Sequence, residues 1–110
     1  MELNSIHWDD MEWIKVREGV HRKAVSSETA TVALHRLMPG NGANPHKHAY
    51  EQIAYIMSGE VDFHVGDRVV RLGPGGVLVI PPNVMHHAVV IGDEPVMNLD
   101  VFTPRRPEYA

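Results

Sequence analysis

The sequence predicts an all-β domain, either a sandwich or a barrel, because strand-sized apolar segments recur at near-even spacing along its 110 residues. Turn-forming glycine, proline, asparagine and aspartate separate these segments. The run 61–65 alternates apolar and polar residues, as a half-buried strand does. No window carries a sustained helical period, although residues 9–13 could form a short turn.

The predicted strands are rich in β-branched and aliphatic residues. They cover residues 29–38, 52–57, 61–65, 68–72, 77–80, 87–91 and 96–102. Two predicted hairpin connections lie at Gly59-Glu60 and Gly66-Asp67, because glycine and aspartate tolerate the positive φ of tight turns. The middle of the chain is therefore expected to form a meander.

Length and composition limit the kind of protein and the kind of partner. A chain of 110 residues, with 44% hydrophobic and 22% charged residues, is expected to form a single globular domain over residues 1–110. The net charge is -4 and the basic residues form no stripe, so no nucleic acid partner is expected. No apolar run approaches the ~20 residues of a membrane helix. The N-terminus lacks a signal-peptide pattern, so we expect a cytoplasmic protein without membrane contacts.

Histidine is the most informative residue type, with eight in the chain, whereas cysteine is absent. Any bound metal must therefore be held by histidine, carboxylate or amide groups. His46 and His48 are two residues apart and face the same way on a strand, and His86 follows the turn 81–83. Gln52 shares their parity and opens the next strand. Three imidazoles and one oxygen donor suit a divalent transition metal.

A straight strand does not bring these residues together. Four residues of straight strand would separate His48 from Gln52 by about 13 Å, so a shared metal requires a bend at residues 49–51. If that bend shifts the register, Glu51 could be the ligand in place of Gln52. A lone His-x-His pair is more often not a metal site, so the prediction depends on all the spacings together.

Read together, these spacings resemble the two motifs of the cupin family. Motif 1 covers residues 40–59 and motif 2 covers residues 75–90. Their matching positions are Gly40, His46, His48, Gln52 and Gly59 in motif 1, and Gly75, Pro81, Asn83, His86 and Val90 in motif 2. Asn83 replaces a glycine of the family, and asparagine also tolerates left-handed backbone. Val90 replaces a final asparagine, which is not a ligand.

The resemblance implies a cupin barrel, also described as a double-stranded β-helix or jelly roll, with one divalent metal near its centre. The implied ligands are His46, His48, Gln52 and His86, and the metal could be Zn, Ni, Fe or Mn. Gln52 replaces the usual glutamate, so the full +2 charge would stay on the metal. Such a site is a stronger Lewis acid and attracts anionic ligands.

The last predicted strand carries Asp100 and Phe102 on one face and the apolar Leu99 and Val101 on the other. An aspartate that points into a barrel is costly unless it is paired or functional. Periodicity alone leaves two possibilities open, namely that Asp100 faces solvent or that it lies inside the barrel.

This ending, Asp-x-Phe followed by proline and arginine, resembles that of small cupins of the pectin-degradation KdgF type, which also carry glutamine as the fourth ligand. The resemblance implies that Asp100, Phe102 and Arg106 line the active site. Pro107 stands where that group tends to have an acidic residue, so Arg105 remains an alternative to Arg106.

The resemblance also implies a reaction on a small anionic sugar. A 4,5-unsaturated uronate from pectin or alginate breakdown would be converted to the linear 4-deoxy-5-keto form by ring opening and tautomerisation, without net redox change. Asp100 would transfer protons, Arg106 would bind the uronate carboxylate, and Phe102 would form an apolar wall. Two alternatives stay open, a metal-dependent dioxygenase and a non-catalytic sugar-binding domain. A homodimer is expected, with the segment around Trp8 and Trp13 as a candidate exchanged strand or interface.

Overall fold

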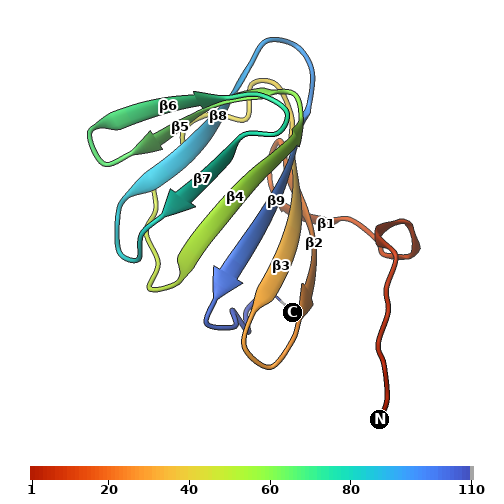
Figure 1. Ribbon diagram of the computed structural model, residues 1–110. Helices are drawn as coiled ribbons and strands as arrows, with labels where there is room; N and C mark the ends of the chain where they lie inside the picture. Colours follow the sequence, from red (N-terminus) through yellow and green to blue (C-terminus); the bar gives the residue numbers. More distant parts are fainter. Residues whose placement is uncertain (110) are drawn as a thin grey trace.

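The computed structural model describes residues 1–109, which form nine strands in two antiparallel sheets and one short 3-10 helix, Trp8–Asp10 (Figure 1). The larger sheet has the strand order β1-β2-β3-β9-β4-β7 and the smaller one β6-β5-β8. The larger sheet contains β1 (Ile14–Arg17), β2 (Val20–Ser26), β3 (Thr31–Leu37), β9 (Val96–Thr103), β4 (Glu51–Ser58) and β7 (Val77–Ile80). The smaller sheet contains β6 (Arg68–Leu72), β5 (Glu60–Val65) and β8 (His86–Ile91). The predicted all-β fold is therefore confirmed.

The hydrophobic core lies between the two sheets. Val61 and Phe63 of β5 and Val90 of β8 meet a set of apolar side chains from the larger sheet. That set comprises Val20, Leu37, Ala54, Ile56, Ile80 and Val96. Burial of apolar surface, which contributes roughly 25 cal/mol per Å², holds the two sheets together. A cavity lined by both polar and apolar side chains remains between them.

Strand β9 lies between β3 and β4 and sets the register of the polar residues. Asp100 pairs with Ala33 on one side and Ala54 on the other, and both alanines are fully buried. In the same ladders, Gln52 is opposite Phe102. Because side chains alternate along a strand, these inward positions of three neighbouring strands face one interior.

The seven predicted strands are present, with bounds that differ by at most two residues, whereas β1 and β2 were missed. Strand β1 has no buried residue, and β2 buries only Val20 and Lys23, so neither shows a clear apolar alternation. The Lys23 ammonium donates to the carbonyl of Trp8 at 2.7 Å and lies 4.5 Å from the Trp13 ring. These contacts replace the water that the ammonium group loses, so Lys23 can be buried in β2.

The hairpin predicted at Gly59-Glu60 is wrong. Strands β4 and β5 lie in different sheets, so of the two predicted connections only Gly66-Asp67 closes a hairpin, which joins β5 to β6. Gly59 has a φ of 81°, and a Cβ atom there would lie 2.6 Å from the Pro95 carbonyl oxygen. Glycine is therefore needed at this corner both for its backbone conformation and for space. A local turn signal cannot show whether the chain returns within one sheet.

The N-terminal residues extend away from the barrel before the 3-10 helix (Figure 1). That helix, Trp8–Asp10, occupies part of the predicted turn at 9–13. Trp13 lies against its own chain, with the Arg36 guanidinium carbon 4.5 Å from the ring centroid. Among residues 1–109 there is no helix with the length and apolar character needed to cross a membrane.

Candidate metal centre

Three histidines from two distant parts of the chain converge at one end of the barrel. His46 forms an isolated bridge with His86, in which each backbone amide donates to the other residue's carbonyl at 3.0 and 2.8 Å. The amide of Asn83 donates to the carbonyl of His48 at 2.8 Å, so the 46–48 segment is anchored at both ends. One ligand nitrogen from each imidazole lies within 4.8 Å of the others.

The three imidazoles share one tautomer. Each Nδ1 lies within hydrogen-bond distance of a backbone carbonyl, and a carbonyl oxygen can only accept. The pairs are His46 with Asn44 at 2.7 Å, His48 with Tyr50 at 2.9 Å, and His86 with Val84 at 2.8 Å. Nδ1 therefore carries the hydrogen in each ring, and each neutral imidazole keeps a lone pair on Nε2 for a ligand.

Burial keeps two of these rings neutral. It lowers the pKa of His86 to about 4 and the pKa of His48 below its ordinary value, because a charged imidazole loses solvation inside the protein. The His86 Nε2 atom is buried and has no hydrogen-bond partner within the described chain. A buried lone pair without a donor is costly unless a cation accepts it.

Gln52 reaches the same point because the chain bends at residues 49–50, where the sequence required a bend. Its Oε1 atom lies 3.1 Å from the His48 Nε2 atom. In the tautomer above both atoms are acceptors, so they repel each other unless a cation lies beside them. Glu51, the alternative ligand, points outward and is exposed. The three Nε2 lone pairs and this amide oxygen together fit a divalent transition cation.

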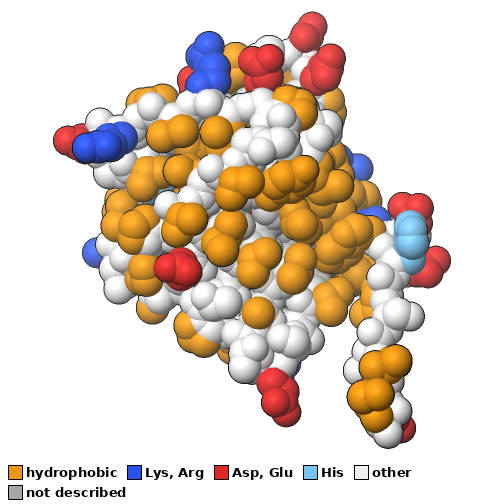
Figure 2. All heavy atoms as spheres, in the orientation of Figure 1, with side chains coloured by type: hydrophobic (Ala, Val, Ile, Leu, Met, Phe, Trp, Pro, Cys, Tyr) orange, Lys and Arg blue, Asp and Glu red, His pale blue; other side chains and the backbone are white. Residues whose placement is uncertain are grey.

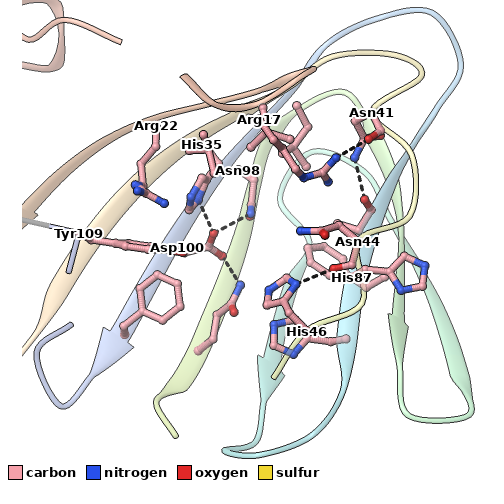
Figure 3. Close-up of a pocket in the computed structure, with 18 of the residues that line it drawn as sticks. Arg17, Arg22, His35, Asn41, Asn44, His46, His87, Asn98, Asp100 and Tyr109 are labelled. Carbon is pink, nitrogen blue, oxygen red and sulfur yellow. Dashed lines mark hydrogen bonds and ion pairs between the residues drawn. The ribbon is translucent and has the colours of Figure 1, made fainter. Parts of the chain in front are cut away.

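Asp100 lies inside the barrel, so the possibility that it faces solvent is excluded; it is only 2% exposed. Its Oδ1 atom accepts from the Gln52 amide at 2.8 Å. Its Oδ2 atom accepts from His35 Nδ1 at 2.8 Å and from Asn98 Nδ2 at 2.9 Å (Figure 3). Three donors satisfy a buried carboxylate that would otherwise be strongly unfavourable.

Phe102 and Arg106 line the cavity above this cluster. The Phe102 ring lies 5.5 Å from the His48 ring, centroid to centroid. The Arg106 guanidinium carbon lies 4.8 Å from the Phe102 centroid and 3.9 Å from that of Tyr109. Its Nη1 atom is buried without a partner among residues 1–109. Arg105 is exposed and does not line the cavity, so the geometry favours Arg106 over Arg105 as a ligand-binding residue.

Residues 33–102 match the family described as the Cupin domain. The chain belongs to the cupin family. The pectin degradation protein KdgF of Dickeya dadantii (strain 3937) is 28% identical over 104 residues, which cover 92% of this chain and 93% of that protein.

Two solved structures agree with this assignment. KdgF from Halomonas sp. has a TM-score of 0.85 and 28% identity, and the match covers 94% of this chain and 97% of that one. An RmlC-like cupin from Shewanella frigidimarina has a TM-score of 0.88 over 99% of this chain and 97% of that one, with 21% identity, and shares the fold. The predicted cupin barrel is therefore confirmed.

The positions at which this cupin departs from the family motifs have local explanations. Asn83 adopts a φ of 63°, the left-handed conformation for which the family uses glycine. Val90 lies in the hydrophobic core, and its amide donates to Asn41 Oδ1 at 3.1 Å. Neither departure replaces a histidine of the cluster, and Asn83 contacts His48 only through its backbone amide.

The cavity of this cupin has a volume of about 390 Å³ and a strongly cationic lining. Four basic side chains line it, and Asp100 is the only carboxylate residue of the described chain among the lining residues. The basic residues are Arg17, Arg22, Lys47 and Arg106. Because the whole chain carries a net charge of -4, this concentration of positive charge is local and favours an anionic ligand.

Sequence reasoning missed several lining residues. Arg17 and Arg22 come from β1 and β2, which were not predicted, and the sequence carries no motif that marks them. Asn98 had a usable signal, because it shares the parity of Asp100 on the last strand. Tyr109 follows the last strand, and its ring lies 3.6 Å from the Arg22 guanidinium carbon. Burial raises the pKa of Tyr109, so its phenol stays neutral.

Proposed function

We propose that this cupin is an enzyme that converts 4,5-unsaturated uronates from pectin or alginate breakdown to linear 4-deoxy-5-keto uronates, with one divalent transition metal at His46, His48, Gln52 and His86. The observation that carries the proposal is one cationic cavity that holds a buried carboxylate, Asp100, beside the histidine cluster. The similarity to KdgF over nearly the full length of both chains supports the substrate class.

The reaction needs a proton shuttle and no oxidant. Removal of the proton from the C1 hydroxyl lets the C1–O5 bond break, which leaves an aldehyde at C1 and an enol oxygen at C5. A proton delivered to C4 then moves the C4=C5 double bond into a C5 ketone. The product is an isomer of the substrate, so atoms and electrons balance.

Asp100 is suited to this shuttle. A carboxylate has about four acceptor positions, and three of them are filled by Gln52, His35 and Asn98. The remaining position can accept the hydroxyl proton and later return it to carbon. The fixed donors hold the carboxylate in place and stabilise the charged form in which it begins and ends the reaction.

Arg106 and Phe102 are suited to holding the sugar. Arg106 lines the cavity and its Nη1 atom has no partner among residues 1–109, so its guanidinium can donate to the uronate carboxylate in a bidentate pair. Phe102 presents an apolar surface to the ring. A divalent cation at the three imidazoles and the Gln52 oxygen would supply Lewis-acid stabilisation of negative charge on a substrate oxygen.

The test is incubation of metal-loaded protein with unsaturated galacturonate, following the loss of the C4=C5 ultraviolet absorbance together with oxygen consumption. We expect the absorbance to fall without oxygen uptake, and the activity to be lost with a chelator and restored by adding the metal back. Stable absorbance with a fully metal-loaded protein would reject the reaction. Oxygen uptake would instead indicate the dioxygenase alternative, and binding without turnover the sugar-binding alternative.

We also propose that the protein forms a homodimer through the outer face of β4 and β7. Alternating residues on the two strands expose apolar side chains there, and Figure 2 shows them gathered across this face. They are Ile53, Tyr55 and Met57 of β4 and Val77 and Val79 of β7. A contiguous apolar face beside an edge strand suits a two-fold interface with a second copy, in which the same surface is buried on both chains.

A further inference from the structure

Gln52 is held at both ends of its side-chain amide, and the two ends have opposite hydrogen-bonding character. The Nε2 atom donates to Asp100 Oδ1 at 2.8 Å, and the Oε1 atom faces the His48 Nε2 atom at 3.1 Å. A carboxylate can only accept, so the amide nitrogen must be the atom that faces Asp100. The carbonyl oxygen is thereby turned toward the histidine cluster.

Asp100 has little freedom to accommodate a different neighbour. Its Oδ2 atom accepts from His35 and Asn98, and its cross-strand neighbours on β3 and β4 are the fully buried Ala33 and Ala54. The Asp100 side chain is 3% exposed, so water cannot readily replace a lost donor. Whatever residue stands at position 52 must therefore donate to Asp100.

We propose that Asp100 selects glutamine over glutamate at position 52 and orients its carbonyl oxygen as a metal ligand, with His35 and Asn98 as positioning residues that act through Asp100. The proposal rests on the metal site proposed above but not on the uronate reaction. A glutamate at position 52 would place two carboxylate oxygens about 2.8 Å apart in a buried site, at the distance of the present hydrogen bond. Two carboxylates this close cannot both stay charged, so one must take up a proton or move away.

The same geometry predicts which second substitution restores the site. In a Gln52→Glu, Asp100→Asn double variant, the new asparagine oxygen can accept from His35 and Asn98 in place of Oδ2. Its amide nitrogen can donate to the new glutamate in place of Oδ1. The double variant keeps all three hydrogen bonds, and only the bond between positions 52 and 100 changes direction. By contrast, Q52E brings two carboxylates face to face, and D100N brings two amide NH₂ groups face to face.

The experiment is a double-mutant cycle with wild type, Q52E, D100N and Q52E/D100N, and it uses no substrate. The first readout is the melting temperature of each chelator-treated protein. The second is the dissociation constant for Ni²⁺ or Zn²⁺, measured by competition with a chelating indicator. Glu51→Gln is the matched control, because Glu51 is adjacent to Gln52 but exposed.

We expect Q52E to lower the melting temperature of the metal-free protein by about 5 °C or more, and the double variant to recover most of this loss. D100N, in which the Gln52 amide can turn over, should weaken metal binding by roughly 10- to 100-fold, and the double variant should bind at least as tightly as wild type. E51Q should change neither quantity. These readouts separate a failure of this proposal from a failure of the proposed reaction.

Two results would overturn the proposal. Additive melting-temperature shifts in the metal-free cycle would show that Asp100 does not select the residue at position 52. Metal affinity that is unchanged in D100N, or a wild-type protein that binds neither ion, would show that Asp100 does not orient a metal ligand.

Discussion

Arg106 provides the sharpest test of how this cavity recognises its ligand. Its side chain is only 14% exposed, its guanidinium lies against the Phe102 and Tyr109 rings, and its Nη1 atom has no partner in residues 1–109. The Nε atom donates to Glu108 at 3.1 Å, which fixes the direction of the guanidinium. The side chain is thus held in place with a donor available to a carboxylate.

The size of the effect follows from this geometry. A hydrogen bond to a charged group contributes about 1.5–3 kcal/mol, so removing a carboxylate pair should cost about 3 kcal/mol. We therefore expect Arg106→Ala to lower kcat/KM for unsaturated galacturonate by about 100-fold. Arg106→Lys should recover only part of this loss, because lysine keeps the charge but not the bidentate geometry.

The matched control is Arg105→Ala, the adjacent residue, which is exposed and outside the cavity. We expect its kcat/KM to stay within about twofold of wild type, since a surface substitution away from the site changes little. The assay is the initial rate of ultraviolet absorbance loss at several substrate concentrations, with metal content measured in parallel. An R106A variant within threefold of wild type, or an equal loss in R105A, would refute the assignment of carboxylate binding to Arg106.

Three further predictions follow from the site and the surface. His86→Ala should weaken metal binding by about 100-fold or more, because it removes a direct ligand, and binding unchanged in an indicator competition would contradict its role. The unfolding free energy of metal-free protein should fall as pH drops from about 6.5 to about 4, because over this range His86 binds a proton in the unfolded state but not in the folded state. Urea unfolding at several pH values should show this dependence, and the His86→Gln variant should show a smaller one. Val79→Lys should give a monomer in light scattering, whereas Val69→Lys, at a similarly exposed position of β6, should stay dimeric; a monomeric wild type or a dimeric V79K would reject this interface.

The sequence contained enough information for the barrel strands and for the proximity of three histidines, but not for the full lining of the cavity. Strands with apolar alternation, such as β4 and β9, were predictable because one face of each is buried. The polar strands β1 and β2 have no such pattern, and their arginines could not be placed. The contact between His35 and Asp100 joins residues 65 positions apart and depends on which strands are neighbours. Periodicity shows which way a side chain points but not which strand lies beside it.

Because β9 lies between β3 and β4, the candidate metal centre and the barrel depend on the same strand pairing. The ladder that pairs β9 with β4 puts Gln52 opposite Phe102 and diagonal to Asp100, and the ladder with β3 puts His35 opposite Asn98. A slip of one residue in either ladder would turn Asp100 or its donors to the outer face and leave buried polar groups without partners. The hydrogen bonds that orient Gln52 therefore also favour the native register of β9. We infer that substitutions in this network change the stability of the metal-free protein as well as metal binding. If these residues served only the reaction, the stability of the metal-free protein would not need to change.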